Sequence, residues 1–271
     1  MLINKIKSKM KTTFPGATAK FFQPAWQAGR RVANSSLFRL RHPEAVVLHV
    51  KNPDAGQFNQ PYLLDFLLDH KTSGFFLDIG ANHPSYNSNS FFFESQRSFT
   101  GIAFDPLRNY AELWSAQRPG TKFLNIALGE TNGEVQFFEH QNDDGWADQL
   151  SYTANSKLHR ESEGATGRIV TVQRLDAIEG MPSNIDFASI DVEGAEIDVL
   201  SGFGEVRPKI LVVENCFGIS GQESIRDQVI SMGYTIAARI TYVDDVYIRN
   251  DLKSVLEKVA SIKTTLSRYF Y

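Results

Sequence analysis

FFLDIGANHPSYNSNS, residues 75–90, is the stretch that decides the fold of this chain. Its apolar start predicts a buried strand that ends near Asp78, and Gly80 then predicts a tight turn into a helix. In a doubly wound sheet, the turn after the first strand lies at the crevice where ligands bind. A pyrophosphate-binding loop needs the GxGxxG pattern, whereas Asn82 and Pro84 follow Gly80 here. The stretch therefore predicts a ligand site at the sheet edge and disfavours a phosphate ligand.

Strand-like and helix-like stretches alternate along the chain around this turn. Strands are predicted at residues 75–79, 101–104, 122–127, 187–191, 210–214, 234–239 and 246–249. Helices are predicted at residues 61–68, 90–98, 110–117, 195–200, 223–232 and 254–266. This order predicts an α/β fold, with a parallel sheet and helices on both of its faces.

A polar segment of about thirty residues interrupts the alternation. It spans residues 140–168 and lies between two short strand candidates, 135–139 and 169–173. A loop of this length in a compact domain is usually a lid or a binding loop. We therefore expect residues 140–168 to be a loop inserted in the domain, placed to contact a ligand.

Charge is distributed unevenly along the chain. The first 41 residues contain nine Lys and Arg and no acid, whereas residues 44–250 contain fifteen Lys and Arg against twenty-nine acids. We expect a basic N-terminal arm over residues 1–57, a domain over 58–250 and a C-terminal helix over 251–271. The acidic domain argues against a nucleic-acid partner, because contacts to phosphates need clustered cations.

Several features of the sequence indicate the cellular compartment of the protein. No apolar run approaches the roughly 18 to 20 residues of a membrane-spanning helix, and the start of the chain shows no secretory signal. The single cysteine, Cys216, cannot form an internal disulfide, so a cytoplasmic protein is favoured. Lys5, Lys7, Lys9 and Lys11 alternate with other residues and predict contact with the inner face of an anionic membrane. The alternatives are a solvated arm or an arm that packs in a dimer or larger oligomer.

Acidic residues stand at the ends of several predicted strands. Asp78, Asp105, Asp191 and Glu214 each end a strand, and Glu193 follows just beyond. Because the carboxyl ends of parallel strands meet at one edge of a sheet, we expect these side chains to gather there. Clustered carboxylates repel pyrophosphate but suit a ligand that carries a sulfonium, an ammonium group and a ribose diol. S-adenosylmethionine is such a ligand.

A set of motifs in a fixed order carries a family resemblance. The motifs are DIGANHP (78–84), NSNSFFFE (87–94), GIAFDP (101–106), NIALGE (125–130), ASIDVEGAEIDVLSGF (188–203), PKILVVEN (208–215) and MGY (232–234), with DDVYI (244–248) after it. Over about residues 58–249 the chain resembles the FkbM-type family of S-adenosylmethionine-dependent methyltransferases. The resemblance implies a Rossmann-like class I methyltransferase sheet of seven strands, the last antiparallel. It also implies methyl transfer to a hydroxyl of a sugar, a glycan or a related natural product.

The resemblance further implies roles for individual residues. Those expected to bind the cofactor, from its methionine end to its adenine, are Asp78, Gly80, Ala81, Asn82, Asp191, Asp105, Pro106, Ala127 and Leu128. An alcohol acceptor must lose its proton during methyl transfer, and a positioned general base accelerates that step. The expected candidates for this base are Asp191, Glu193, Glu214 and His140.

The same edge of the sheet also offers a hypothetical metal site. Asp191, Glu214 and Asn215 would supply two carboxylates and one amide oxygen, a set that suits Mg²⁺ or Mn²⁺. This arrangement is similar to the metal site of catechol-type O-methyltransferases, where the ion orients the acceptor. The alternative is that Glu214 binds the substrate directly and that Asp191 binds the amino group of the cofactor.

Two other functions stay open from the sequence. A nicotinamide-dependent oxidoreductase would use the same crevice, but the lone glycine of its turn disfavours that function. A non-catalytic protein with a methyltransferase fold, bound at a membrane surface, would explain the basic ends, but the intact acids argue against it. The expected partner is therefore a polar acceptor that bears hydroxyl groups.

Overall fold

The computed structural model describes residues 37–51, 53–140, 151–156, 165–216 and 219–270. The chain divides into two compact units, residues 1–43 and residues 44–271. Of the first unit only residues 37–43 are described, and residues 37–41 are helical. The predicted membrane contact through Lys5 to Lys11 lies outside the described residues.

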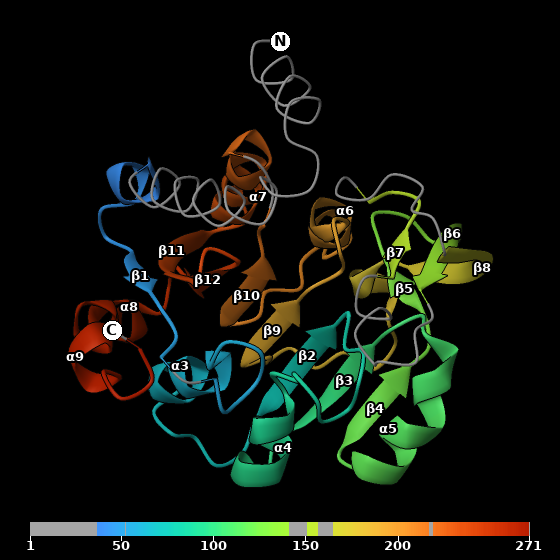
Figure 1. The fold of residues 1–271 in the computed structure, drawn as a ribbon, viewed down its shortest axis with the longest axis horizontal. Coiled ribbons are helices and arrows are strands. Elements are labelled where there is room, and N and C mark those ends of the chain that lie inside the picture. Colours follow the sequence, from blue (N-terminus) through green and yellow to red (C-terminus); the bar gives the residue numbers. More distant parts are fainter. Residues whose placement is uncertain (1–36, 52, 141–150, 157–164, 217–218, 271) are drawn as a thin grey trace, which may run out of the picture. The chain divides into compact units, whose positions relative to one another are not determined.

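Eight strands form the main sheet of the second unit, in the order β1-β11-β12-β10-β9-β2-β3-β4 (Figure 1). The strands are β1 (Val46–Leu48), β2 (Phe75–Ile79), β3 (Thr100–Phe104), β4 (Thr121–Leu124), β9 (Phe187–Ile190), β10 (Ile210–Glu214), β11 (Tyr234–Ile240) and β12 (Asp244–Arg249). Every neighbouring pair is parallel except those of β12, which runs antiparallel to both β10 and β11. This order confirms the predicted Rossmann-like sheet with an antiparallel last strand, and β1 extends it by one strand.

The direction of the chain through the sheet reverses between β2 and β9. From β2 the chain moves outward to β3 and β4, whereas β9 and β10 extend the sheet the other way. β2 and β9 are parallel neighbours, with Asp78 opposite Ser189 and Ile79 opposite Ile190. Ligands of open α/β sheets bind in the crevice at such a switch point, outside the carboxyl ends of the strands.

Helices cover both faces of the sheet, as predicted. The helices are α3 (Gln60–Leu67), α4 (Phe91–Arg97), α5 (Ala111–Gln117), α6 (Glu196–Ser201), α7 (Ile219–Ser231), α8 (Lys253–Glu257) and α9 (Ile262–Thr265). Apolar residues of α3, α4 and the C-terminal segment share one core cluster with one face of the sheet. The C-terminal segment, predicted as a single helix, is divided into α8, the 3₁₀ helix Lys258–Ser261 and α9.

Aromatic packing fixes α4 against the sheet. Phe93 is fully buried, and its ring centroid lies 4.5 Å from that of Phe187 and 5.1 Å from that of Phe99. Burying one such ring stabilises the fold by roughly 1.5–3 kcal/mol. Because α4 directly follows the loop of residues 82–89, this packing also holds that loop over the carboxyl end of β2.

A second, smaller sheet contains the two strands predicted on either side of the polar segment 140–168 and a few residues of that segment. It has the order β5-β8-β6-β7, with β5 (Ala127–Leu128), β6 (Gly133–His140), β7 (Tyr152–Thr153) and β8 (Ala165–Gln173). β6 and β8 pair antiparallel along their whole length, from Gly133 opposite Val172 to His140 opposite Ala165. The strands predicted at residues 135–139 and 169–173 lie in β6 and β8. The residues by which these strands reach further into the segment, His140 and 165–168, are half-buried or exposed. They lack the apolar alternation by which a strand is predicted.

The N-terminal boundary of the domain also differs from the prediction. Residues 44–57, assigned to the basic arm, belong to the same unit as the sheet, and β1 pairs in parallel with β11. Three residues are too few to show an alternating pattern, so this strand was not predicted. Within the described residues, no helix is long and apolar enough to cross a membrane.

Candidate functional site

Two adjoining cavities lie at the carboxyl ends of β2, β3, β9 and β10. The first cavity encloses about 550 Å³ and reaches from the end of β3 to the second sheet. The second cavity encloses about 630 Å³ and lies between the loop of residues 86–89 and the ends of β9 and β10. Both volumes include the open solvent at the mouths of the cavities. The cavities share Gly80, Asn82, Asp191 and Glu193, so two bound ligands would meet at these residues.

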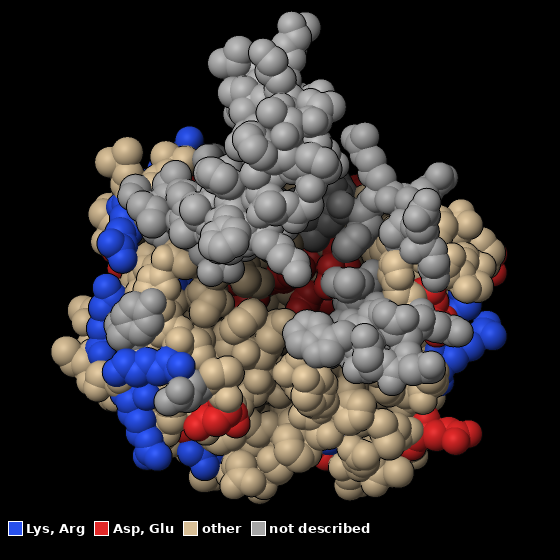
Figure 2. Space-filling model, in the orientation of Figure 1, with Lys and Arg blue, Asp and Glu red and all other residues tan. Residues whose placement is uncertain are grey.

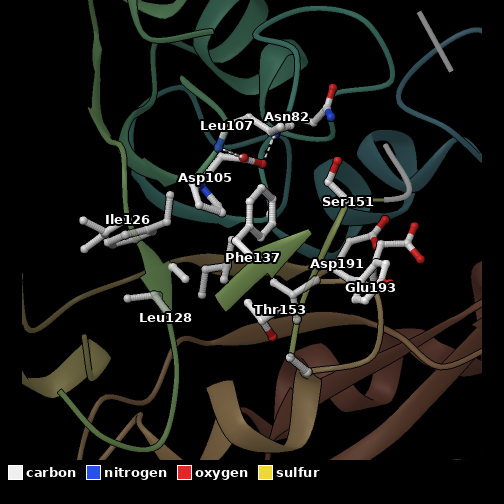
Figure 3. Close-up of a pocket in the computed structure, with 18 residues that line it drawn as sticks. Asn82, Asp105, Leu107, Ile126, Leu128, Phe137, Ser151, Thr153, Asp191 and Glu193 are labelled. Carbon is white, nitrogen blue, oxygen red and sulfur yellow. Dashed lines mark hydrogen bonds between the residues drawn. The ribbon is translucent and has the colours of Figure 1, made fainter. Parts of the chain in front are cut away.

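The first cavity has apolar walls and carboxylates at its two sides. Ile126, Leu128 and Phe137 supply the apolar surface. Figure 3 shows Asp105 on one side of this cavity, and Asp191 with Glu193 together on the other. An apolar slot between carboxylates suits a flat ring joined to polar, positively charged groups.

Gly80 is required by the backbone at the end of β2. Its φ is +79°, a conformation that side chains disfavour, and a Cβ there would lie 1.7 Å from the carbonyl oxygen of Asp191. The N–H groups of Gly80 and Ala81 both donate to the carbonyl oxygen of Phe104, at 2.9 and 3.1 Å. The absence of a side chain therefore lets the turn after β2 pack directly against the end of β9.

Asp105 holds two loops of the site. One carboxylate oxygen accepts the N–H of Asn82 and the other accepts the N–H of Leu107, each at 2.8 Å (Figure 3). The side chain is 5% exposed and lines the first cavity. Each carboxylate oxygen has two acceptor positions, so acceptor capacity remains for a ligand hydroxyl beside the backbone donors.

Asp78 lines the second cavity together with Ala81. The Ser90 hydroxyl donates to Asp78 at 2.5 Å, and Arg118 donates to the same hydroxyl oxygen at 3.1 Å. Burial raises the pKa of Asp78 to about 6, although the bond from Ser90 opposes this shift. Asp78 is thus held in place by a buried network that connects the cavity floor to Arg118.

Three carboxylates meet at the wall of the second cavity and form what we call the carboxylate triad. Asp191, Glu193 and Glu214 each place one oxygen within 4.8 Å of the oxygens of the other two. All three line the second cavity, and Figure 2 shows acidic side chains gathered in a hollow near the centre of one face. No Lys or Arg is found among the described residues that line either cavity.

Burial raises the pKa values of these acids, and for Glu193 and Glu214 the neighbouring negative charges raise them further. Desolvation by burial raises the pKa of Asp191. Burial, followed by the charges of Asp191 and Glu196, raises the pKa of Glu193 to about 8. Burial and the charge of Asp191 raise the pKa of Glu214 well above its ordinary range. A ligand with positive charge would therefore be favoured here, because it relieves the repulsion between these carboxylates.

Two further buried acids surround the triad. Glu196 accepts the N–H groups of Val192 and Gly194 through one oxygen, and burial raises its pKa to about 7. The amide of Gln60 donates to Asp244 at 2.7 Å, and burial likewise raises the pKa of Asp244 to about 7. Neither acid lines either cavity. Glu196 holds the turn after β9, and both acids add negative charge near the triad.

The metal set predicted from the sequence is corrected at one position. Asn215 is fully buried, and its Nδ2 donates to Asp245 at 2.7 Å and to the carbonyl oxygen of Gln222 at 3.1 Å. These bonds connect Asn215 to α7 and to the buried ion pairs of Asp245, and Asn215 lines neither cavity. Glu193, and not Asn215, is the third group that joins Asp191 and Glu214.

The structure also places the two other candidates for chemistry. His140 ends β6, its N–H donates to the Ser151 hydroxyl at 3.1 Å, and it lines neither cavity. Its role as a base stays a prediction. Cys216 is a free cysteine and is exposed.

Several cavity residues were not predicted individually from the sequence. Ser151, Tyr152 and Thr153 line the first cavity and belong to the segment 140–168, which was expected to contact a ligand. Phe137 was not expected there, and its place follows from how β6 and β7 pair. The second cavity adds Tyr86, Asn87, Ser88, Asn89 and Ser189. The polar run at residues 85–90 was the sequence signal for this cavity wall. Polar side chains between a strand and a helix commonly cap the helix or bind a ligand.

The strand order, the glycine turn at the switch point and the acid at the end of β3 together define a Rossmann-like, class I methyltransferase. The model of the methyltransferase FkbM domain matches residues 78–236, and the chain belongs to this family. The protein is accordingly an S-adenosylmethionine-dependent methyltransferase. Of the residues expected to bind the cofactor, Pro106, Ala127 and Leu128 line the first cavity with Asp105.

Solved structures give only distant likenesses. A TehB-like S-adenosylmethionine-dependent methyltransferase from Corynebacterium glutamicum is 8% identical, with a TM-score of 0.37 over 69% of this chain and 86% of that one. The N-terminal domain of human METTL16 is 11% identical, with a TM-score of 0.41 over 81% of this chain and 80% of that one. A human methyltransferase 10 domain containing protein is 11% identical, with a TM-score of 0.41 over 82% of this chain and 97% of that one. A comparison with curated proteins found no match.

Proposed function

We propose that the protein transfers a methyl group from S-adenosylmethionine to a hydroxyl group of a sugar, a glycan or a related natural product. The observation that carries this proposal is the junction of the two cavities at Gly80, Asn82, Asp191 and Glu193. A cofactor in the first cavity and an acceptor in the second would meet at this junction. Holding two reactants in such an arrangement supplies much of the acceleration of a displacement reaction.

The first cavity fits the cofactor in shape and in charge. Gly80 lines this cavity without a side chain, and Ile126 with Leu128 offers an apolar surface to a base. Asp105 has acceptor positions for a ribose diol, and Asp191 faces the positively charged end. When bound, the cofactor supplies an electrophilic methyl group. The residues of this chain hold it, exclude water and present its charged end to the shared wall.

The second cavity fits an acceptor rich in hydroxyl groups. Asn87, Asn89 and Ser189 line it with amide and hydroxyl groups, and Tyr86 adds an aromatic ring that is 52% exposed. Polar groups of this kind fix the orientation of a ligand, while an aromatic ring packs against its apolar face. Glu193, at the shared wall, is placed to accept the proton of the acceptor hydroxyl.

The test is methyl transfer by the purified protein with a panel of sugars, glycans and simple polyols. We expect S-adenosylhomocysteine to be released with at least one hydroxyl acceptor, and mass spectrometry with chemical degradation to place the methyl group on oxygen. Calorimetry should show binding of S-adenosylhomocysteine and none of NADH. A methyl group found only on nitrogen or carbon would overturn the choice of acceptor, and binding of NADH alone would overturn the function.

Asp105→Ala is expected to weaken S-adenosylhomocysteine binding about ten- to a hundredfold, because a ribose diol loses a buried charged acceptor. Calorimetry on the folded variant measures this loss. Asn125→Ala is the matched control, since Asn125 bonds the carbonyl oxygens of Asp105 and Leu107 at 2.8 Å and supports the same loop without lining the cavity. An equal loss in both variants would show that Asp105 acts only by ordering the loop.

We also propose that the protein acts in the cytoplasm, at the inner face of the membrane, through its basic N-terminal residues. The support is the cluster of Lys5, Lys7, Lys9 and Lys11 in the sequence, each basic residue near an anionic surface being worth about 1 kcal/mol. Sedimentation with anionic liposomes at low and high salt measures the contact. We expect binding that salt weakens and that deletion of residues 1–11 removes; unchanged binding after the deletion would reject this role.

A further inference from the structure

We propose that the carboxylate triad of Asp191, Glu193 and Glu214 binds one hard divalent cation, Mg²⁺ or Mn²⁺, in the wall of the second cavity. The three side chains come from the end of β9, the turn after it and the end of β10, so the sheet itself sets their spacing. One oxygen of each lies within 4.8 Å of the others. Oxygens bound to Mg²⁺ at about 2.1 Å are at most about 4.2 Å apart, so small side-chain rotations close the site.

A buried oxygen of Glu214 points independently to a ligand. The Glu214 side chain is 9% exposed and lines the second cavity, and its Oε2 is buried with no hydrogen-bond partner among the described residues. A carboxylate oxygen that is removed from water and left without a donor costs free energy. A cation bound by the Glu214 carboxylate would offset this cost, whereas a neutral apolar ligand would not.

The charge around the second cavity also favours a cation. The cavity is lined by the triad and Asp78, and by no Lys or Arg within the part of the chain that the structure describes. The nearby buried guanidinium groups are engaged elsewhere: Arg118 bonds Glu94 at 2.6 Å, and Arg239 bonds Asp245 at 2.5 Å. The cationic end of the cofactor needs one carboxylate at the shared wall, which leaves negative charge on the acceptor side.

A cation held here would act on the acceptor. Three protein oxygens leave further positions of a six-coordinate ion open, and two neighbouring hydroxyl groups of one acceptor can occupy them. Coordination lowers the pKa of a bound hydroxyl and fixes its position at the junction of the cavities. This role rests on the proposed methyl transfer to a hydroxyl, whereas the binding of the cation does not.

The experiment measures Mn²⁺ binding to the full chain by electron paramagnetic resonance, after exhaustive chelation and removal of the chelator. We expect Mn²⁺ to bind once per chain, and Mg²⁺ to displace it. Glu214→Gln and Glu193→Gln should each weaken binding by more than about tenfold, since each loses a charged ligand. Glu193 is partly exposed, so its variant tests the site even if Glu214→Gln does not fold.

Asp244→Asn is the matched control, because it removes one buried charge of the same neighbourhood from a residue that does not line the cavity. Because Asp244 contributes charge but is not a ligand, this variant should weaken Mn²⁺ binding clearly less than Glu193→Gln does. No binding of Mn²⁺ below millimolar concentrations, or equal losses in Asp244→Asn and Glu193→Gln, would overturn the site. Calorimetry with S-adenosylhomocysteine in chelator separates the two proposals: cofactor binding without Mn²⁺ binding rejects only the cation, and the reverse rejects only the methyl transfer.

Discussion

Gly80→Ala is expected to abolish detectable S-adenosylhomocysteine binding and to lower the free energy of unfolding by roughly 2–5 kcal/mol. The added Cβ would lie 1.7 Å from the carbonyl oxygen of Asp191 and 2.7 Å from its carbonyl carbon. These are backbone atoms at the end of β9, so they cannot rotate away as the tip of a flexible side chain would. The end of β9 must move away from the end of β2, and that movement displaces Asp191 and Glu193 from the wall that both cavities share.

Gly180→Ala separates this clash from backbone strain. Gly180 has a φ of +76°, close to the +79° of Gly80, but a Cβ there would meet nothing within 4 Å. The control variant should lose only the roughly 1–2 kcal/mol that a side chain costs in this conformation, with cofactor binding unchanged. Denaturant unfolding and calorimetry on both variants give the comparison. Equal losses of stability, or a Gly80→Ala protein that binds the cofactor normally, would show that the turn tolerates a side chain.

The parts of the fold that were predicted correctly have local signals. β2, β9 and β10 are short, largely apolar runs with an acid at or next to their carboxyl ends, and such runs predict buried parallel strands. The turn at Gly80 was also predicted from a local signal, since a glycine after a buried strand indicates a tight turn. Their order along the chain then restricts the topology, because parallel strands need crossover connections.

The second sheet was predicted only in part. Residues 135–139 and 169–173 were predicted as strands, but their pairing with each other and with β7 was not. Residues 165–168 of β8 are half-buried or exposed, and β7 is two residues long. Such segments become strands through pairing with β6, which is a tertiary effect. The place of Phe137 in the wall of the first cavity was missed for the same reason.

The acids of the site were predicted more reliably than their partners. Asp105, Asp191, Glu193 and Glu214 stand at strand ends, so the topology alone brings them to one edge. The direction of a side chain at a strand end depends on its neighbours, and here Asp245 binds the amide of Asn215 and holds it away from the cavities. Sequence spacing gave no signal of this competition, because Asp245 is thirty positions away.

Asp245→Asn is expected to destabilise the protein by about 3–5 kcal/mol, because it removes the negative partner of two buried guanidinium groups. Asp245 and Arg239 are fully buried, and Arg226 is 2% exposed. Arg239 donates to one carboxylate oxygen at 2.5 Å, and Arg226 donates to the other at 2.8 Å. The network joins α7, β11 and β12 beside the end of β10, so its loss should also loosen the position of Glu214.

The pH dependence of stability distinguishes this ion pair from simple packing. Burial alone would raise the pKa of Asp245, but the charges of Arg239 and Arg226 outweigh it and hold the pKa below its ordinary value. The unfolded chain then binds the proton first as the pH falls. The stability contributed by Asp245 is therefore complete above the ordinary pKa of aspartate, about 3.9, and is lost as the pH falls through the lower pKa of the folded state.

Urea unfolding of the native protein and of Asp245→Asn between pH 3 and 8 measures this contribution as the difference between the two curves. The difference should be constant near neutral pH and shrink at the acid end. Asp251→Asn is the matched control, because Asp251 also pairs with an arginine, Arg249 at 2.6 Å, but is 61% exposed. Its unfolding midpoint should stay close to that of the native protein, since water and salt screen an exposed pair. A small loss of stability in Asp245→Asn that does not change with pH would mean that the buried network stabilises the fold by packing and not by charge.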